Sequence, residues 1–208
     1  MSASSITSPD RGTLLVISGP SGVGKSSVVD GLLHETGASF SVSATTRAPR
    51  PGEVEGEDYF FIGPDEFDRL IADDELLEWA EYGGNRYGTP RRAVLHRLSA
   101  GENVVLDIEN LGAHQVKAAY PEAVLVFIVP PSMDELERRL RARGDTSAEN
   151  VERRLGVAAG QVADAKESFD HLVVNDELET AISQVVPILV PSNTPGVGVD
   201  APGDRTEE

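Results

Sequence analysis

The stretch TLLVISGPSGVGKSS, from Thr13 to Ser27, decides the fold of this chain. Its first part, Thr13 to Ser18, is a short apolar run typical of a buried strand. The part from Gly19 to Ser26 fits G-x-x-x-x-G-K-[ST], and helical spacing follows from Lys25 to His34. A strand, a glycine-rich loop and a helix in this order form a phosphate-binding loop, because consecutive N–H groups and the helix N-terminus favour anionic oxygens.

This loop predicts that a nucleoside triphosphate binds, and by itself it predicts no more. Lys25 would reach the β- and γ-phosphates, and the Ser26 hydroxyl would ligate Mg²⁺. A glycine–serine turn with a chance lysine is the alternative, and the strand–helix context disfavours it. The predicted triphosphate-binding residues are Gly19, Pro20, Ser21, Gly22, Val23, Gly24, Lys25, Ser26 and Ser27.

Outward from the loop, apolar strands alternate with helical patterns. Further strands are expected at Asn103–Ile108, Ala123–Val129 and His171–Val174. Helices are expected at Gly112–Ala119, from a capping pair of Ser132 and Glu135, from near Thr146 with Glu149 three residues on, and from about Glu177. The alternation predicts an α/β fold, in which helices cover both faces of a parallel sheet.

The stretch from Phe40 to about Pro90 breaks this rhythm, with short polar and aromatic segments and one expected helix near Glu66–Ala72. We interpret residues 40–90 as a mixed α+β insertion into a core of residues 11–39 and 91–190. The polar ends, residues 1–10 and 191–208, are expected to be flexible tails, because they carry too little apolar surface to fold alone.

The composition excludes several classes of function. The chain has 208 residues and a formal net charge of −17, which disfavours binding to nucleic acid or to anionic membrane. It has no cysteine, so disulfides and thiol catalysis are excluded, and its four histidines show no ligand spacing. No signal peptide or membrane-spanning run is apparent, so we expect a cytoplasmic enzyme. The sequence leaves the oligomeric state open.

Within the insertion, Arg47 and Arg50 lie three residues apart, with Tyr59 nearby in the sequence. Two guanidinium groups and a phenol suit a phosphate monoester dianion. Surface arginines and a core tyrosine are the alternative.

Here the chain resembles the guanylate kinase family. The motifs that carry the resemblance are SVSATTR-x-PR-x-GE, GxDYFF, LLEWAE, N-x-YGT and the terminal VVND, which with the loop cover about residues 13–190. The resemblance implies an ATP:GMP phosphotransferase of purine nucleotide metabolism with Mg²⁺ as cofactor, in which the insertion binds GMP. It implies that Arg47, Arg50, Tyr59 and Tyr87 hold the GMP phosphate.

Glu78 is the expected specificity residue. A carboxylate accepts both donors of the guanine Watson–Crick edge, whereas adenine presents an acceptor there. Without the family context, Glu78 would be interpreted as a solvated strand residue. Ser43 and Thr89 match family positions whose hydroxyls contact the base.

Two acidic residues, Asp107 and Glu109, follow the buried run VVL, and strand alternation predicts that both lie on the same side. A carboxylate at the carboxyl end of a parallel strand is well placed for Mg²⁺ or its waters, so Asp107 is the second predicted metal residue with Ser26. Glu109 stands where the family more commonly has Asp, and the resemblance places it on the GMP side.

Arginines concentrate in residues 138–156, which resemble the family's helical lid over ATP. An exposed helix with Glu–Arg pairs is the alternative for these arginines. Alignment with the family selects Arg139, Arg143 and Arg154, with Lys25, as the catalytic set. Asn175 in VVND matches a family position near the adenine of ATP.

Two other functions remain open at this point. One is a related kinase of small molecules or other nucleotides, which the guanine-reading set disfavours. The other is a non-catalytic guanylate-kinase-like module that binds phosphorylated partners, which the complete loop and the lid arginines disfavour.

Overall fold

The computed structural model describes residues 11–142 and 147–190. The two tails expected at residues 1–10 and 191–208 lie outside the described residues. So does the segment 143–146, which includes the predicted catalytic residue Arg143.

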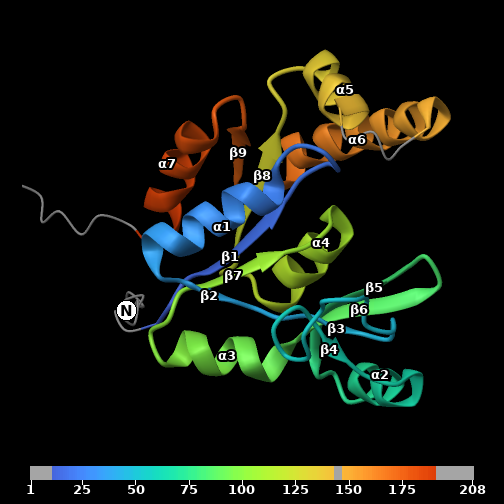
Figure 1. Ribbon diagram of the computed structural model, residues 1–208. Helices are drawn as coiled ribbons and strands as arrows, with labels where there is room; N and C mark the ends of the chain where they lie inside the picture. Colours follow the sequence, from blue (N-terminus) through green and yellow to red (C-terminus); the bar gives the residue numbers. More distant parts are fainter. Residues whose placement is uncertain (1–10, 143–146, 191–208) are drawn as a thin grey trace, which may run out of the picture.

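A central sheet of parallel strands, in the order β2-β7-β1-β8-β9, forms the middle of the described chain (Figure 1). Its strands are β1 (Leu14–Ser18), β2 (Ser39–Phe40), β7 (Val104–Asp107), β8 (Val124–Val129) and β9 (His171–Val174). The register pairs Ile17 with Asp107, so β1 and β7 end side by side where the phosphate loop begins. This edge of a parallel sheet is where ligands of α/β folds bind.

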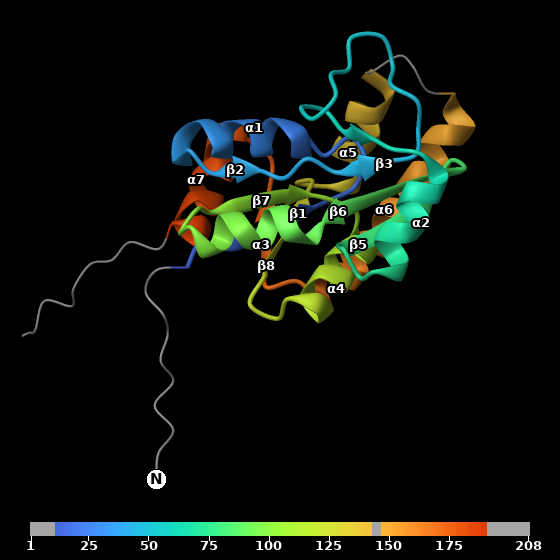
Figure 2. The same ribbon diagram turned by 90° about the horizontal axis from the view of Figure 1, so that it is seen from below.

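Helices cover both faces of the central sheet, as Figure 2 shows. Helices α1 (Lys25–Thr36) and α7 (Leu178–Leu189) pack on one face, and α3 (Arg91–Ser99) and α4 (Asn110–Ala119) pack on the other. Leu15 and Ile17 of β1 face the first pair, whereas Leu14 and Val16 face the second. Because both faces are covered, β1 is buried along its whole length, which explains its apolar run from Leu14 to Ile17.

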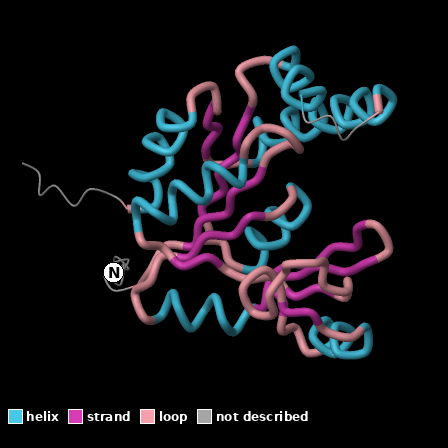
Figure 3. Tube along the Cα trace, in the orientation of Figure 1, coloured by secondary structure: helices cyan, strands magenta, loops and turns pink. Residues whose placement is uncertain are grey.

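The segment between β2 and α3 forms a second, mixed sheet in the order β4-β3-β6-β5, visible as a separate group of strands in Figure 3. Its strands are β3 (Ala44–Thr45), β4 (Phe60–Phe61), β5 (Leu76–Tyr82) and β6 (Asn85–Pro90). The helix α2 (Pro64–Ala72) packs on this sheet through Phe67. Phe67 forms a small hydrophobic core with Ala44 and Leu76, separate from the core of the central sheet.

Helices α5 (Met133–Ala142) and α6 (Ala148–Ser168) form a third group. They pack together through Leu136, Leu140, Val151 and Ala158. In Figure 1 this pair lies on one side of the carboxyl ends of β1 and β7, and the second sheet with α2 lies on the other side. The phosphate loop therefore lies between the two groups.

The α/β class, the parallel core and the helices on both faces confirm the fold predicted from the sequence. Two helix starts differ in detail. Helix α4 begins two residues before the predicted Gly112, because Glu109 takes the N-cap position. The cap of α6 is Ser147, whose Oγ accepts from the N–H of Asn150 at 3.4 Å, rather than Thr146, which lies outside the described residues. Among the described helices, none is long and apolar enough to cross a membrane.

Candidate functional site

The phosphate loop joins β1 to α1, and two of its glycines take backbone conformations that other residues rarely adopt. Gly22 and Gly24 have φ angles of 87° and 91°. A Cβ on Gly24 would lie 2.5 Å from Nδ2 of Asn175, so this position excludes a side chain on two grounds. No side chain among the described residues caps α1, and its first turn carries no acidic residue. The first turn of α1 is therefore suited to an anionic ligand.

Lys25, at the start of α1, is held by the end of β7. Its Nζ lies 2.6 Å from Oδ1 of Asp107 and donates to the carbonyl of Ile108 at 3.2 Å. The next two residues, Ser26 and Ser27, are exposed in the first turn of α1. The structure thus brings together the ammonium, the hydroxyls and the acidic strand end that the sequence assigns to a triphosphate and its metal.

A set of hydrogen bonds fixes the middle of the loop at Val23. The Val23 carbonyl accepts from Nδ2 of buried Asn175 at 2.8 Å and from Nη1 of Arg139 at 3.4 Å. The same Nη1 of Arg139 also donates to the Asn175 carbonyl at 2.9 Å, and Glu135 pairs with its Nε at 2.7 Å. In the structure, Arg139 and Asn175 therefore contact the backbone of the loop.

Helix α6, which begins in the predicted lid, reaches the loop through Arg154. Its Nη1 lies 3.5 Å from Oγ of Ser21, at the limit of a hydrogen bond. Three of the four predicted catalytic residues, Lys25, Arg139 and Arg154, therefore contact the loop or the end of β7. The fourth lies outside the described residues.

Arg47, in the loop after β3, is paired with a carboxylate that sequence reasoning did not assign. Glu53 accepts from Nη1 at 2.9 Å and from Nη2 at 2.8 Å, and it also accepts from the backbone N–H of Arg50 at 2.6 Å. The Arg47 hydrogen bonds lower the pKa of Glu53 to about 2, and the same pairing raises the pKa of Arg47. The signal for Glu53 was present in the quoted PR-x-GE motif, but the sequence alone does not show which way the loop folds back.

Two aromatic rings lie beside the Arg47 guanidinium, with ring centres at 5.3 Å for Tyr59 and 5.8 Å for Phe61. Tyr59 in turn meets Tyr87 edge-on, with ring centres 6.0 Å apart. Burial raises the pKa of the Tyr59 phenol, and the charge of Asp107 is among the smaller causes. Arg47, Tyr59 and Tyr87 are thus brought together. Arg50 is joined to them through its backbone N–H, and its side chain is exposed.

Glu78 lies in an irregular part of β5 and is only 6% exposed. The pairing of β5 with β6 gains one residue between Leu76 and Trp79, a β-bulge of the kind that re-aims a side chain. Thr89 of β6 donates from Oγ1 to Oε1 of Glu78 at 2.7 Å. Burial raises the pKa of Glu78, and the hydrogen bonds from Thr89 oppose this shift. The structure therefore contradicts the alternative of a solvated strand residue. Ser43, the other predicted base contact, is half-buried just before β3.

Glu109 does not follow the strand alternation expected of it, because β7 ends at Asp107. Its carboxylate accepts from Nε2 of Gln161 in α6 at 3.1 Å. The adjacent Asn110 is buried and contacts Ser18, Gln161 and Asp164, a role that the sequence pattern did not indicate. A polar residue at the first helical position after a buried strand was the available signal.

Within the described residues, no group of three or more His, Asp or Glu side chains could hold a metal ion by itself. The oxygen donors of Ser26 and Asp107 would therefore need further ligands from a phosphate or from water. That donor chemistry suits Mg²⁺ bound together with a nucleotide.

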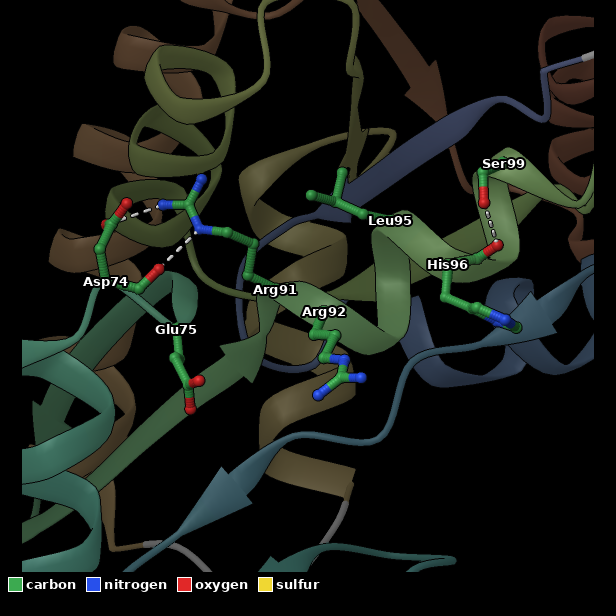
Figure 4. Close-up of a pocket in the computed structure, with 7 residues that line it drawn as sticks. All are labelled: Asp74, Glu75, Arg91, Arg92, Leu95, His96 and Ser99. Atoms are coloured by element: carbon green, nitrogen blue, oxygen red, sulfur yellow. Dashed lines mark hydrogen bonds and ion pairs between the residues drawn. The ribbon is translucent and has the colours of Figure 1, made fainter.

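The surface also carries a cavity of about 420 Å³ between the start of β5 and α3, shown in Figure 4. Arg91 spans its rim, where it donates from Nε to the Asp74 carbonyl and from Nη2 to the Asp74 carboxylate, both at 2.9 Å. None of the described residues that line it belongs to the predicted site.

The family model, the curated relatives and a solved structure each show similarity to guanylate kinases. The family model described as guanylate kinase matches residues 11–191. The guanylate kinase of Synechococcus sp. (strain JA-3-3Ab) is 50% identical over 189 residues, which cover 90% of this chain and 86% of that protein. The guanylate kinase of Streptomyces coelicolor is 54% identical over 180 residues, which cover 86% and 91%. The crystal structure of guanylate kinase from Anaplasma phagocytophilum matches with a TM-score of 0.68 and 36% identity, covering 86% of this chain and 85% of that one.

Proposed function

The chain belongs to the guanylate kinase family, and on this premise we propose how its residues bind ATP and GMP. Its activity is that of an ATP:GMP phosphotransferase, which converts ATP and GMP to ADP and GDP and back. The contacts described above and the family pattern support the assignment of individual residues to this reaction.

The phosphate loop takes the triphosphate of ATP. Backbone N–H groups of Gly19 and of Ser21 to Ser27 surround the phosphates, and Lys25 places its charge against the β- and γ-phosphates. Asn175 and Arg139 support this arrangement, because both hold the Val23 carbonyl in the middle of the loop.

Ser26 and Asp107 are the residues that would hold Mg²⁺. When bound with ATP, the ion offsets charge on the phosphate oxygens. Asp107 also keeps Lys25 at the strand end, with 2.6 Å between its Oδ1 and the Lys25 Nζ, so one carboxylate organises both positive charges.

The second sheet takes GMP. We assign the phosphate to Arg47, Arg50, Tyr59 and Tyr87, because a guanidinium beside the Tyr59 phenol, which in turn contacts Tyr87, suits a phosphate dianion. We assign the guanine base to Glu78, with Thr89 and Ser43 as hydroxyl partners. Glu109 is assigned to the GMP side of the site on the family pattern, while its contact with Gln161 ties it to α6.

Phosphoryl transfer places negative charge on the equatorial oxygens of the transferred group. Arg139, Arg143 and Arg154 with Lys25 are the cations that we assign to this charge. We assign no general base, because the phosphate of GMP is already ionised at neutral pH. Closure of α5 and α6 over the site would exclude water, which otherwise competes as acceptor.

The observation that carries the choice of guanine is the burial of Glu78 with its hydrogen bond from Thr89. A base with two adjacent donors satisfies such a carboxylate, and adenine leaves it facing an acceptor. The ion pair between Lys25 and Asp107 favours an active enzyme over the non-catalytic module. The cytoplasmic location and the absence of nucleic-acid and membrane partners stay predictions.

The proposal is tested by ADP release from purified full-length protein with MgATP and each of GMP, AMP, UMP and CMP. We expect turnover with GMP, its loss in Lys25→Met, and no change in Lys166→Met, an exposed lysine of α6. Turnover with another acceptor would favour the related-kinase alternative. Folded protein that binds a phosphopeptide but turns over no acceptor would favour the module.

A further inference from the structure

A half-buried side-chain amide of α4 holds the backbone of β5 next to Glu78. Gln115 of α4 donates from Nε2 to the Trp79 carbonyl at 2.9 Å, and its Oε1 accepts from the Trp79 N–H at 3.1 Å. Because β5 is the edge strand of the second sheet, this amide pairs with the strand as a neighbouring strand would. Sequence reasoning gave Gln115 no role.

The two hydrogen bonds of Gln115 act at the β-bulge that orients the Glu78 side chain. The extra residue of β5 lies between Leu76 and Trp79, so Gln115 fixes the strand where regular pairing resumes. One helical turn earlier on the same face of α4, Gly112 lies against the carboxylate, since a Cβ there would be 2.7 Å from Oε2 of Glu78. Helix α4 thus contacts both the carboxylate and the backbone beside it.

These contacts make the position of Glu78 depend on the core of the protein. Thr89 holds Oε1 from within the second sheet, whereas Gln115 and Gly112 belong to a helix packed on the central sheet. A bulge has fewer ladder hydrogen bonds than a regular strand, so an external tie is needed to keep one geometry.

We propose that Gln115 is a positioning residue for guanine selectivity, which holds the bulge of β5 so that the Glu78 carboxylate meets the base edge. The inference rests on the proposed function, in which Glu78 reads the base. Gln115 touches no substrate in this account and acts only through β5.

The central test is Gln115→Met, which keeps the length of the side chain and removes both hydrogen bonds. Gln115→Glu is the second variant, because it keeps an acceptor for the Trp79 N–H but turns a carboxylate toward the Trp79 carbonyl. Gln184→Met, an exposed glutamine of α7, is the matched control.

Selectivity is measured as the ratio of kcat/KM for GMP to kcat/KM for inosine monophosphate, which lacks the 2-amino group. Loss of two hydrogen bonds should lower this ratio by roughly tenfold in Gln115→Met and at least as much in Gln115→Glu. The KM for ATP should stay at the wild-type value in both Gln115 variants. In the control Gln184→Met, both the KM for ATP and the thermal midpoint should stay at wild-type values.

Trp79 supplies a second readout, because it is the only tryptophan of the chain. A GMP titration followed by its fluorescence gives the dissociation constant without turnover. We expect a weaker GMP constant in Gln115→Met, with the ATP constant unchanged.

An equal loss of affinity for ATP and GMP in Gln115→Met would overturn the proposal, and so would a lower thermal midpoint with unchanged selectivity. Gln115 would then have a structural role only. Wild-type selectivity in both variants would overturn it as well.

The variant Glu78→Gln separates a failure of this proposal from a failure of the proposed function. If Glu78→Gln keeps full GMP selectivity, the base assignment itself fails. If Glu78→Gln loses selectivity and Gln115→Met does not, only the positioning role fails. In the Glu78→Gln background, Gln115→Met should cause no further loss.

Discussion

Asn110 joins the strand that leads into the phosphate loop to helix α6. Its Oδ1 accepts from Oγ of Ser18, the last residue of β1, at 3.1 Å, and its Nδ2 donates to Oδ2 of Asp164 at 3.1 Å. The same Nδ2 donates to the Gln161 carbonyl at 3.2 Å. One buried amide therefore connects the base of the loop with the helix that carries Arg154.

Asn110→Val should destabilise the protein, because the buried Ser18 hydroxyl loses its acceptor. An unsatisfied buried hydroxyl costs about 1–3 kcal/mol of the free energy of unfolding, which urea titration measures. The double variant Ser18→Ala with Asn110→Val removes both partners and should lose less than the sum of the two single variants. A strictly additive result would show that the two side chains do not depend on each other.

Glu53→Gln should weaken GMP binding, because the loop from Arg47 to Arg50 loses the carboxylate that orders it. We expect the KM for GMP to rise by roughly 5- to 20-fold, with the KM for ATP unchanged. Glu57→Gln, an exposed residue of the same loop, is the control. A lower KM for GMP in Glu53→Gln would mean instead that Glu53 competes with the phosphate for Arg47.

Arg138 and Arg139 give a matched pair on α5. Arg138, with 71% of its side chain exposed, pairs with Glu135, whereas Arg139 also reaches the Val23 and Asn175 carbonyls. Arg139→Met should lower kcat/KM for ATP by about 10²-fold or more, and Arg138→Met by less than about twofold. Similar losses in the two variants would remove Arg139 from the site.

The activity should show an acid limb that originates in Glu78. Burial raises the pKa of this carboxyl above its ordinary value of 4.5. Only the ionised carboxylate accepts both guanine donors, so kcat/KM for GMP should fall as the pH falls through this raised pKa. The phosphate of GMP also titrates, and Glu78→Gln keeps that limb while it loses the one from the carboxyl. Identical profiles in the two proteins would refute the assignment.

The contribution of Glu78 to protein stability falls as the pH rises, whereas its contribution to activity rises with pH. Because the folded state raises the pKa of Glu78, it favours the protonated form. Glu78 therefore contributes stability below its ordinary pKa, and this contribution is lost as the pH rises through the folded pKa. Glu78→Gln should be more stable than the wild type near neutral pH in urea titrations, and equal stability there would contradict the burial argument.

Local patterns in the sequence predicted the central sheet well. The run from Leu14 to Ile17 is apolar at every position because helices cover both faces of β1, and this signal does not depend on distant residues. The phosphate loop was equally clear, because Gly24 is required both by its backbone angle and by its contact with Asn175.

The site contacts that the sequence did not predict are those between distant segments. The alternation expected for Asp107 and Glu109 ends where β7 ends, and only the packing of α6 decides that Glu109 meets Gln161. No local residue pattern marks the bulge at Glu78, because it arises from the register between β5 and β6. The partner of Arg47 likewise depends on how the loop to Glu53 folds back.

The central claim is that a buried Glu78 selects guanine in an ATP-dependent phosphoryl transfer. Its most direct test is the ratio of kcat/KM for GMP to kcat/KM for AMP, measured by ADP release in the wild type and in Glu78→Gln at neutral pH. The account predicts a ratio of about 10⁴ or more in the wild type and its collapse by several powers of ten in the variant, with the KM for ATP unchanged. An unchanged ratio in folded Glu78→Gln would contradict it.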